Sequence, residues 1–176
     1  FNFTAMASHP TQGGFNVNAN THIDDIDLVS LTATLLEDLA TGPMSGQFFG
    51  IYYRDRRDLV VPDNRPLTPA AGCAAPGAGD SFRSCDDGTI SIMTVGLNLT
   101  HAIDVGPGRL DLLLWSAGQV GNWESLDQES WAYALETGYQ LPKVAWTPWV
   151  RLGFFRSSGD DDPNDGDHGT FFQILP

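Results

Sequence analysis

The chain has 176 residues, of which 41% are hydrophobic, and its formal net charge at pH 7 is −13. This length suits one domain. The acidic charge argues against nucleic acid as a partner, because nucleic-acid affinity comes mostly from Lys and Arg on phosphates, and also against an anionic inner-membrane surface. No run approaches 18 apolar residues, which excludes a membrane-spanning helix.

Seven segments have the β-branched, aromatic or alternating composition of β-strands. We expect them at residues 1–9, 27–36, 46–54, 91–101, 109–120, 130–140 and 149–157. The connections between them alternate in length: 10–26, 55–90, 121–129 and 158–176 are long, and 37–45, 102–108 and 141–148 are short. Outer-membrane β-barrels alternate short periplasmic turns with longer extracellular loops, so we predict that the four long connections are extracellular.

These segments predict an all-β fold: a transmembrane antiparallel β-barrel that forms a single domain over residues 1–176. Bacterial single-chain barrels close with an even number of strands. The roughly seven strands are therefore expected to be part of a larger barrel, of which this chain is an interior segment. An isolated open sheet would expose unpaired edges, which neither water nor lipid tolerates well.

Most of the predicted strands have one apolar face and one face of small or polar residues, as a membrane barrel requires. The residues predicted to face lipid include Val29, Leu31, Val95, Leu97, Leu135 and Leu152. In segment 46–54 we assign Phe49, Ile51 and Tyr53 to the lipid face and Arg54 to the opposite face. Four aromatic residues are expected at the membrane interfaces: Trp131, Tyr139, Trp146 and Trp149.

The polar faces predict the lining of a pore. The candidate pore-lining residues are Arg54, Arg151, Glu136, Asp111, Asn98, Gln119 and Gln140. Arg54 and Arg151 are expected to attract carboxylates, since a guanidinium binds a carboxylate through two parallel hydrogen bonds.

Two features fall in the long connections. Cys73 and Cys85 lie twelve residues apart with no second ligand pair near them, which favours a loop-closing disulfide over a zinc site. The acidic run at 157–167 suggests calcium, with Asp160, Asp162 and Asn164 as candidate ligands. It does not follow the EF-hand pattern, and a solvated turn-forming loop is the alternative.

A family resemblance rests on four runs: WAYALETGYQ at 131–140, PWVRLGFFR at 148–156, SGDDDPNDG at 158–166 and GTFFQILP at 169–176. Together they resemble the alginate-export family of outer-membrane β-barrels, and residues before 131 are similar only in general character. The resemblance implies a channel in the outer membrane of a Gram-negative cell, with outer-membrane lipid and lipopolysaccharide around it.

The functional expectation is an outer-membrane porin for passive passage of a hydrophilic, anionic saccharide. The alternative is a secreted calcium-dependent β-sandwich binding module. An enzyme is not expected: the sequence contains neither G-x-S-x-G nor H-E-x-x-H. Glu136 and Asp111 offer a carboxylate pair for glycoside chemistry, but pore lining explains both more simply. No cofactor is expected apart from the calcium considered above.

Overall fold

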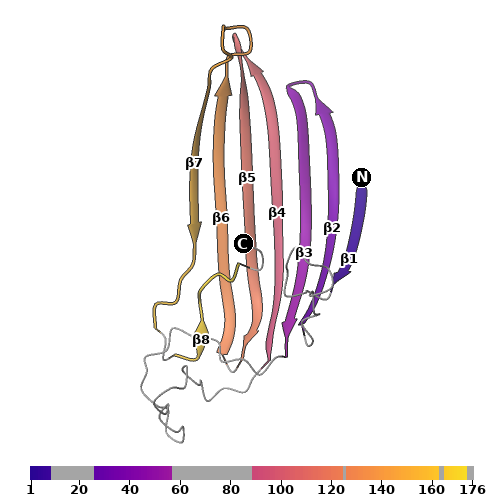
Figure 1. Cartoon of the computed structure of the whole chain (residues 1–176), viewed down its shortest axis with the longest axis vertical. Helices are drawn as coiled ribbons and strands as arrows, with labels where there is room; N and C mark the ends of the chain where they lie inside the picture. Colours follow the sequence, from indigo (N-terminus) through magenta and orange to yellow (C-terminus); the bar gives the residue numbers. More distant parts are fainter. Residues whose placement is uncertain (9–25, 57–88, 125, 163–164, 174–176) are drawn as a thin grey trace, which may run out of the picture.

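The computed structural model describes residues 1–8, 26–56, 89–124, 126–162 and 165–173. Its strands are β1 (Asn2–Ser8), β2 (Ile26–Leu39), β3 (Gly42–Asp55), β4 (Ile90–Val105), β5 (Gly108–Trp123), β6 (Leu126–Gln140), β7 (Trp149–Ser157) and the short β8 (Asp167–His168). Strands β1 to β7 form one sheet in chain order, and each pairs antiparallel with the next (Figure 1).

The seven predicted strands and the all-β fold are confirmed. The sheet is not closed within the described residues, since β1 and β7 form its two edges. No helix in this part of the chain is long and apolar enough to cross a membrane.

The prediction of a long connection at 121–129 is wrong. β5 and β6 stay paired to Asn122↔Asp127 and Trp123↔Leu126, so only residues 124 and 125 lie between the two strands. The strands continue because Trp123 and Leu126 are both buried in the core, so their apolar side chains hold the hairpin together up to its end. Of the other long connections, most of 10–26 and 55–90 lies outside the described residues.

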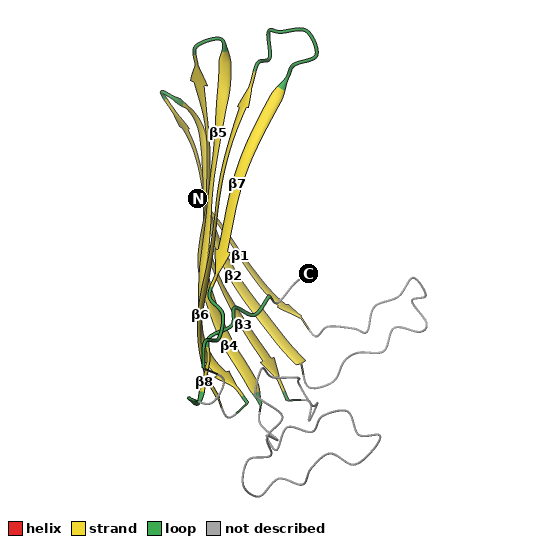
Figure 2. Ribbon diagram, turned by 90° about the vertical axis from the view of Figure 1, so that its left-hand side faces the viewer, coloured by secondary structure: helices red, strands yellow, loops and turns green. Residues whose placement is uncertain are grey.

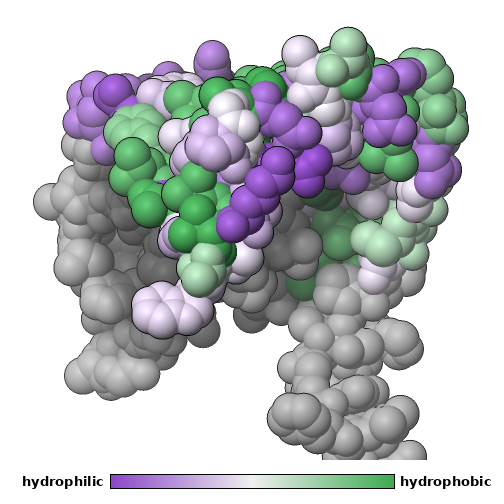
Figure 3. All heavy atoms as spheres, turned by 90° about the horizontal axis from the view of Figure 1, so that it is seen from above, coloured by the Kyte–Doolittle hydropathy of each residue, from purple (hydrophilic) through white to green (hydrophobic). Residues whose placement is uncertain are grey.

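The β2–β3, β4–β5 and β6–β7 turns lie together at one end of the sheet, at the top of Figure 1, which we call the turn end. The β5–β6 turn and β8 lie at the opposite end, the loop end. Seen from the turn end, hydrophilic and hydrophobic residues are mixed over the visible surface (Figure 3).

The sheet is curved, and the chain after β7 folds back along its concave side (Figure 2). Strand β4 shows how the residues divide between the two faces: Ile92 and Thr94 are buried on the concave face, whereas Met93 and Val95 are exposed on the convex face. The strand register carries this alternation across the sheet.

The six aliphatic residues predicted to share the lipid face do lie on one face, the convex one. All are exposed there: Val29, Leu31, Val95, Leu97, Leu135 and Leu152. An exposed apolar surface of this extent marks a face that contacts something other than water.

The facing predicted for β3 is wrong by one residue. Ile51 pairs with Thr94 and Tyr53 pairs with Ile92, which puts Phe49, Ile51 and Tyr53 on the concave face. Because β3 carries aromatic residues on both faces, its sequence has no polarity difference that fixes the register.

The hydrophobic core lies on the concave face near the loop end. It consists of Ile90, Ile92, Trp123 and Leu126, with Tyr53 and Phe172 packed against it. Phe172 comes from the chain after β7, so this core joins the sheet to the segment folded over it. The rest of the concave face toward the turn end is open.

Candidate functional site

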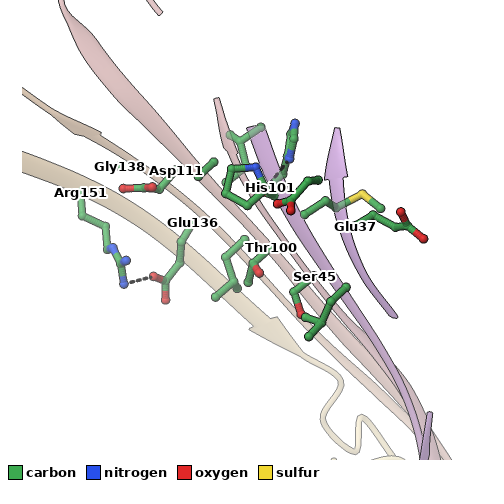
Figure 4. Close-up of a pocket in the computed structure, with 15 residues that line it drawn as sticks. Glu37, Ser45, Thr100, His101, Asp111, Glu136, Gly138 and Arg151 are labelled. Atoms are coloured by element: carbon green, nitrogen blue, oxygen red, sulfur yellow. Dashed lines mark hydrogen bonds and ion pairs between the residues drawn. The ribbon is translucent and has the colours of Figure 1, made fainter. Parts of the chain in front are cut away.

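The open part of the concave face forms a hollow of about 700 Å³ near the turn end. Its polar lining comes from six neighbouring strands: Glu37 and Asp38 from β2, Ser45 from β3, Thr100 from β4, Asp111 from β5, Glu136 from β6 and Arg151 from β7 (Figure 4). A hollow of this size is within the range of small-molecule binding sites, and hydroxyl and charged groups give it hydrogen-bonding capacity.

An ion pair crosses the β6–β7 side of the hollow. Arg151 donates from Nη1 to Oε2 of Glu136 over 3.0 Å, and the two side chains are 47% and 34% exposed (Figure 4). The Arg151 guanidinium also lies 4.7 Å from the centre of the Trp149 ring. Because both partners contact water, the pair contributes little to stability and remains available to a solute.

Two glycines make room for these side chains. Gly138 stands opposite Arg151, and a Cβ at Gly138 would lie 2.9 Å from Nε1 of Trp149 and 3.6 Å from Oδ2 of Asp111. Gly153 stands opposite Glu136, and a Cβ there would lie 3.4 Å from its Cγ. The alternation of glycine with a long polar residue therefore lets the charged groups pack flat against the sheet.

The concave face of the described strands carries more carboxylates than guanidiniums. The register places Asp38, Asp55, Asp104, Asp111 and Glu136 on it, against Arg109 and Arg151. Nε of Arg109 lies 3.4 Å from Oδ1 of Asp104, and Arg151 forms an ion pair with Glu136. Each of these guanidiniums therefore has a carboxylate beside it. This part of the surface does not favour anions.

Six of the seven candidate pore-lining residues lie on the concave face: Arg151, Glu136, Asp111, Asn98, Gln119 and Gln140. Arg151, Glu136 and Asp111 are brought together in the hollow. Gln119 is not in the hollow, because the segment after β7 covers it and leaves it 1% exposed.

Arg54 is the exception, and its predicted position is wrong. It pairs across from Ser91, on the convex face, where the neighbouring Tyr52 hydroxyl hydrogen-bonds the Ser91 hydroxyl over 2.9 Å. The one-residue error in β3 moves Arg54 together with the rest of that strand.

Trp149 is a concave-face residue that sequence reasoning missed. It was expected at the membrane interface, but it pairs with Gln140 and lies against Gly138 and Arg151. Its alternation with Arg151 and Gly153 along β7 is the signal that places it on this face. Trp131, by contrast, lies on the convex face, where it stacks on Tyr133 with ring centres 5.6 Å apart.

The acidic run forms turns in the part that is described. The Asp160 carboxylate accepts a hydrogen bond from the Asp162 backbone N–H, and the Asp165 carboxylate accepts one from Asp167. No cluster of three or more His, Cys, Asp or Glu residues within the described ranges is arranged to hold a metal. Asn164, Cys73 and Cys85 lie outside the described residues, so the calcium and disulfide predictions stay predictions.

Comparison with known proteins agrees with this two-faced antiparallel sheet. The model of a family described as "Alginate export" matches residues 47–176, well over half of the chain. The chain belongs to the alginate export family. This is a family of transport proteins rather than enzymes, and its members are typically outer-membrane β-barrels. No curated protein and no solved structure gave a match.

The matched range begins within β3 and includes every strand from β4 onward. The resemblance seen in residues 131–176 is thus confirmed and extends toward the N-terminus. All residues of the Arg151–Glu136–Asp111 cluster fall within it.

Proposed function

We propose that this chain forms part of the wall of an outer-membrane channel in a Gram-negative cell, through which a hydrophilic saccharide passes without energy input. The observation that carries the proposal is the division of one sheet into an exposed apolar convex face and a polar concave face. That division is what a lipid-embedded barrel with a water-filled interior requires. The family supports the export role.

The concave face offers a saccharide both hydroxyl partners and charged partners. Ser45 and Thr100 present hydroxyls, Asp111 and Glu136 present acceptors, and Arg151 presents donors. Sugar hydroxyls both donate and accept hydrogen bonds, so a mixed set of this kind suits a sugar chain.

The expectation of an anionic solute depended on two arginines facing the pore. Arg54 lies on the convex face, however, and Arg151 is paired with Glu136. We therefore propose that this wall suits a neutral saccharide better than a polyuronate. The fixed carboxylates would raise the local concentration of cations, because a narrow low-dielectric throat focuses the field of its charges.

The convex face suits lipid. Trp131, Tyr133 and Phe154 form an aromatic row with ring centres 5.6 and 5.9 Å apart, and the Arg156 guanidinium lies 5.8 Å from the centre of the Trp131 ring. Aromatic side chains of this kind occupy membrane interfaces, and an arginine beside them can reach headgroup phosphates. Outer-membrane lipid and lipopolysaccharide are the partners we propose for this face.

A secreted β-sandwich module is the weaker alternative. A sandwich needs two sheets packed face to face, about 10 Å apart. The described strands form one sheet, and its open concave surface contains the hollow described above.

Reversal-potential measurements on the full-length protein in planar bilayers test the proposal. Replacing Arg151 with Ala removes a positive charge from the pore wall, so we expect the pore to become more cation-selective. Arg156→Ala is the matched control, because Arg156 lies on the convex face opposite Tyr133. A protein that forms no conducting channel, or one in which both variants shift selectivity equally, would contradict the proposed pore wall.

A further inference from the structure

The segment at 165–173, which we call the inner segment, crosses the concave face near the loop end and is held there by side-chain amides. Gln119 makes four hydrogen bonds. Its Nε2 donates to the Phe172 carbonyl over 2.7 Å and to the Thr94 hydroxyl over 3.1 Å. Its Oε1 accepts from the Phe172 N–H over 2.7 Å and from the Ser130 hydroxyl over 2.9 Å. One glutamine thus satisfies both backbone groups of Phe172, as a neighbouring β-strand would.

A second glutamine, Gln128 on β6, also binds the inner segment. Gln128, 2% exposed, donates from Nε2 to the Thr170 carbonyl over 3.1 Å and to the Ser130 hydroxyl over 2.8 Å. Its Oε1 lies within hydrogen-bonding distance of Nδ1 of His168. Ser130 connects the two glutamines, so they form one buried polar network. A buried hydrogen-bond network in which every polar group has a partner is rigid. If one group moves away, the group that it bonded is left buried without a hydrogen bond.

Aromatic packing fixes the same segment to three further residues of the sheet. The ring of Phe172 lies 5.3 Å from that of Tyr53 and 5.2 Å from that of Trp123. Phe171 meets Trp115 edge-on at 6.1 Å. These contacts reach from β3 to β5, whereas the glutamines reach from β5 to β6.

The inner segment is also tied at its start and near its end. The short β8 pairs parallel with β6 at Asp127↔Asp167, and the Asp127 N–H donates to the Gly166 carbonyl over 3.1 Å. The Phe171 N–H donates to the Ser158 carbonyl over 3.4 Å, which ties the segment to the residue after β7. It is therefore a fixed part of the concave surface, anchored by backbone, amide and aromatic contacts together.

We propose that the inner segment is a permanent constriction that sets the largest solute the channel admits, with Gln119 as the residue that positions it. This proposal rests on the proposed channel function. A peptide layer packed on a sheet takes up roughly 10 Å of the space in front of it. Placed on the inner face of a pore wall, such a layer narrows the bore, whereas the hollow near the turn end stays open.

The test uses the full-length protein in planar bilayers, with neutral polyethylene glycols of graded size as the probe of the bore. One variant replaces residues 169–173 with Gly and Ser. Since conduction depends on the width of the narrowest part, we expect its conductance to rise by about twofold or more and larger polymers to enter. A second variant, Gln119→Leu, keeps the side-chain size but removes all four hydrogen bonds, and we expect a smaller change in the same direction.

Gln47→Leu is the matched control, because Gln47 lies on the concave face of β3 across from Asn98 and Thr34, away from the inner segment. Hydrogen exchange of the Phe172 amide gives a readout that does not depend on conduction. Losing the acceptor at Gln119 should speed that exchange about tenfold or more, and Gln47→Leu should leave it unchanged.

An unchanged conductance and polymer cut-off in the segment-replacement variant would overturn the constriction. Unchanged exchange at Phe172 in Gln119→Leu would overturn the positioning role of Gln119. A wild-type protein that does not conduct would instead remove the proposed channel, and the constriction with it, whatever the exchange rates show.

Discussion

At the scale of single residues, the Arg151–Glu136 pair decides how the wall presents its charge. Each partner stands opposite a glycine, and each remains partly in water. A half-exposed pair of this kind is worth about 0–1 kcal/mol, so its importance is electrostatic rather than structural.

Replacing Glu136 with Gln should shift the selectivity of the proposed pore toward anions. The change removes a carboxylate from the concave face and leaves the Arg151 guanidinium without its charged partner. The free energy of unfolding should change by less than about 1 kcal/mol. Reversal potentials measured in a salt gradient check the shift. Glu129→Gln is the control, since Glu129 pairs across from Val120 on the convex face. A shift toward cations, or an equal shift in both variants, would show that Glu136 does not face the conducting path.

Single residues also show which parts of the candidate site could be predicted from the sequence. Arg151, Glu136 and Asp111 were predicted together because each was assigned to the face opposite the more apolar series of its own strand. The alternation is less clean for Asp111, since Leu113 and Trp115 share its face. The face predicted for Arg54 was wrong because β3 has aromatic residues on both faces: Phe48, Phe49, Tyr52 and Tyr53. Only pairing with β4 shows which face is inside.

At the scale of elements, the β5–β6 hairpin depends on Gly121. This glycine has φ of +147°, and a Cβ added to it would lie 2.0 Å from the backbone oxygen of Ser91 on the neighbouring strand. Glycine, asparagine and aspartate around this position suggest a loop, but the burial of Trp123 and Leu126 beyond it keeps the strands paired. Turn-forming composition alone could not predict that outcome, because the core it depends on includes Phe172 from far along the chain.

Replacing Gly121 with Ala should destabilise the protein. A backbone conformation that L-residues rarely adopt costs about 1–3 kcal/mol, and the close approach to Ser91 adds to this. Denaturant unfolding in detergent micelles measures the change. Gly50→Ala is the matched control, because a Cβ at Gly50 would meet nothing within 4 Å. Equal stability of the two variants would mean that β4 and β5 do not approach each other as closely as described.

The position of the inner segment is a second feature that the sequence could not predict. The run at 158–176 was expected to be an extracellular loop, and its acidic part does form turns. Residues 169–172, which follow, lie on the concave face, where Gln119 and Gln128 hydrogen-bond their backbone. These two glutamines lie about 50 and 40 residues earlier in the chain. A polar glutamine on a predicted pore face gives no sign in the sequence that it binds a peptide backbone rather than a solute.

At the scale of the whole molecule, the curved sheet divides the residues into two environments. The convex face exposes large apolar side chains, and the concave face carries the polar hollow and the inner segment. This division agrees with the family to which the chain belongs and carries the proposal of a lipid-embedded channel wall.

Nitroxide spin labels placed along β3 and β4 in the full-length protein, reconstituted in bilayers, test this division most directly. Labels at Phe48, Val95 and Leu97 lie on the convex face and should be accessible to oxygen and shielded from polar relaxing agents. Labels at Gln47, Asn98 and Thr100 lie on the concave face and should show the reverse. Access of the polar agent to both sets would mean that the convex face contacts water, and the membrane channel would be ruled out.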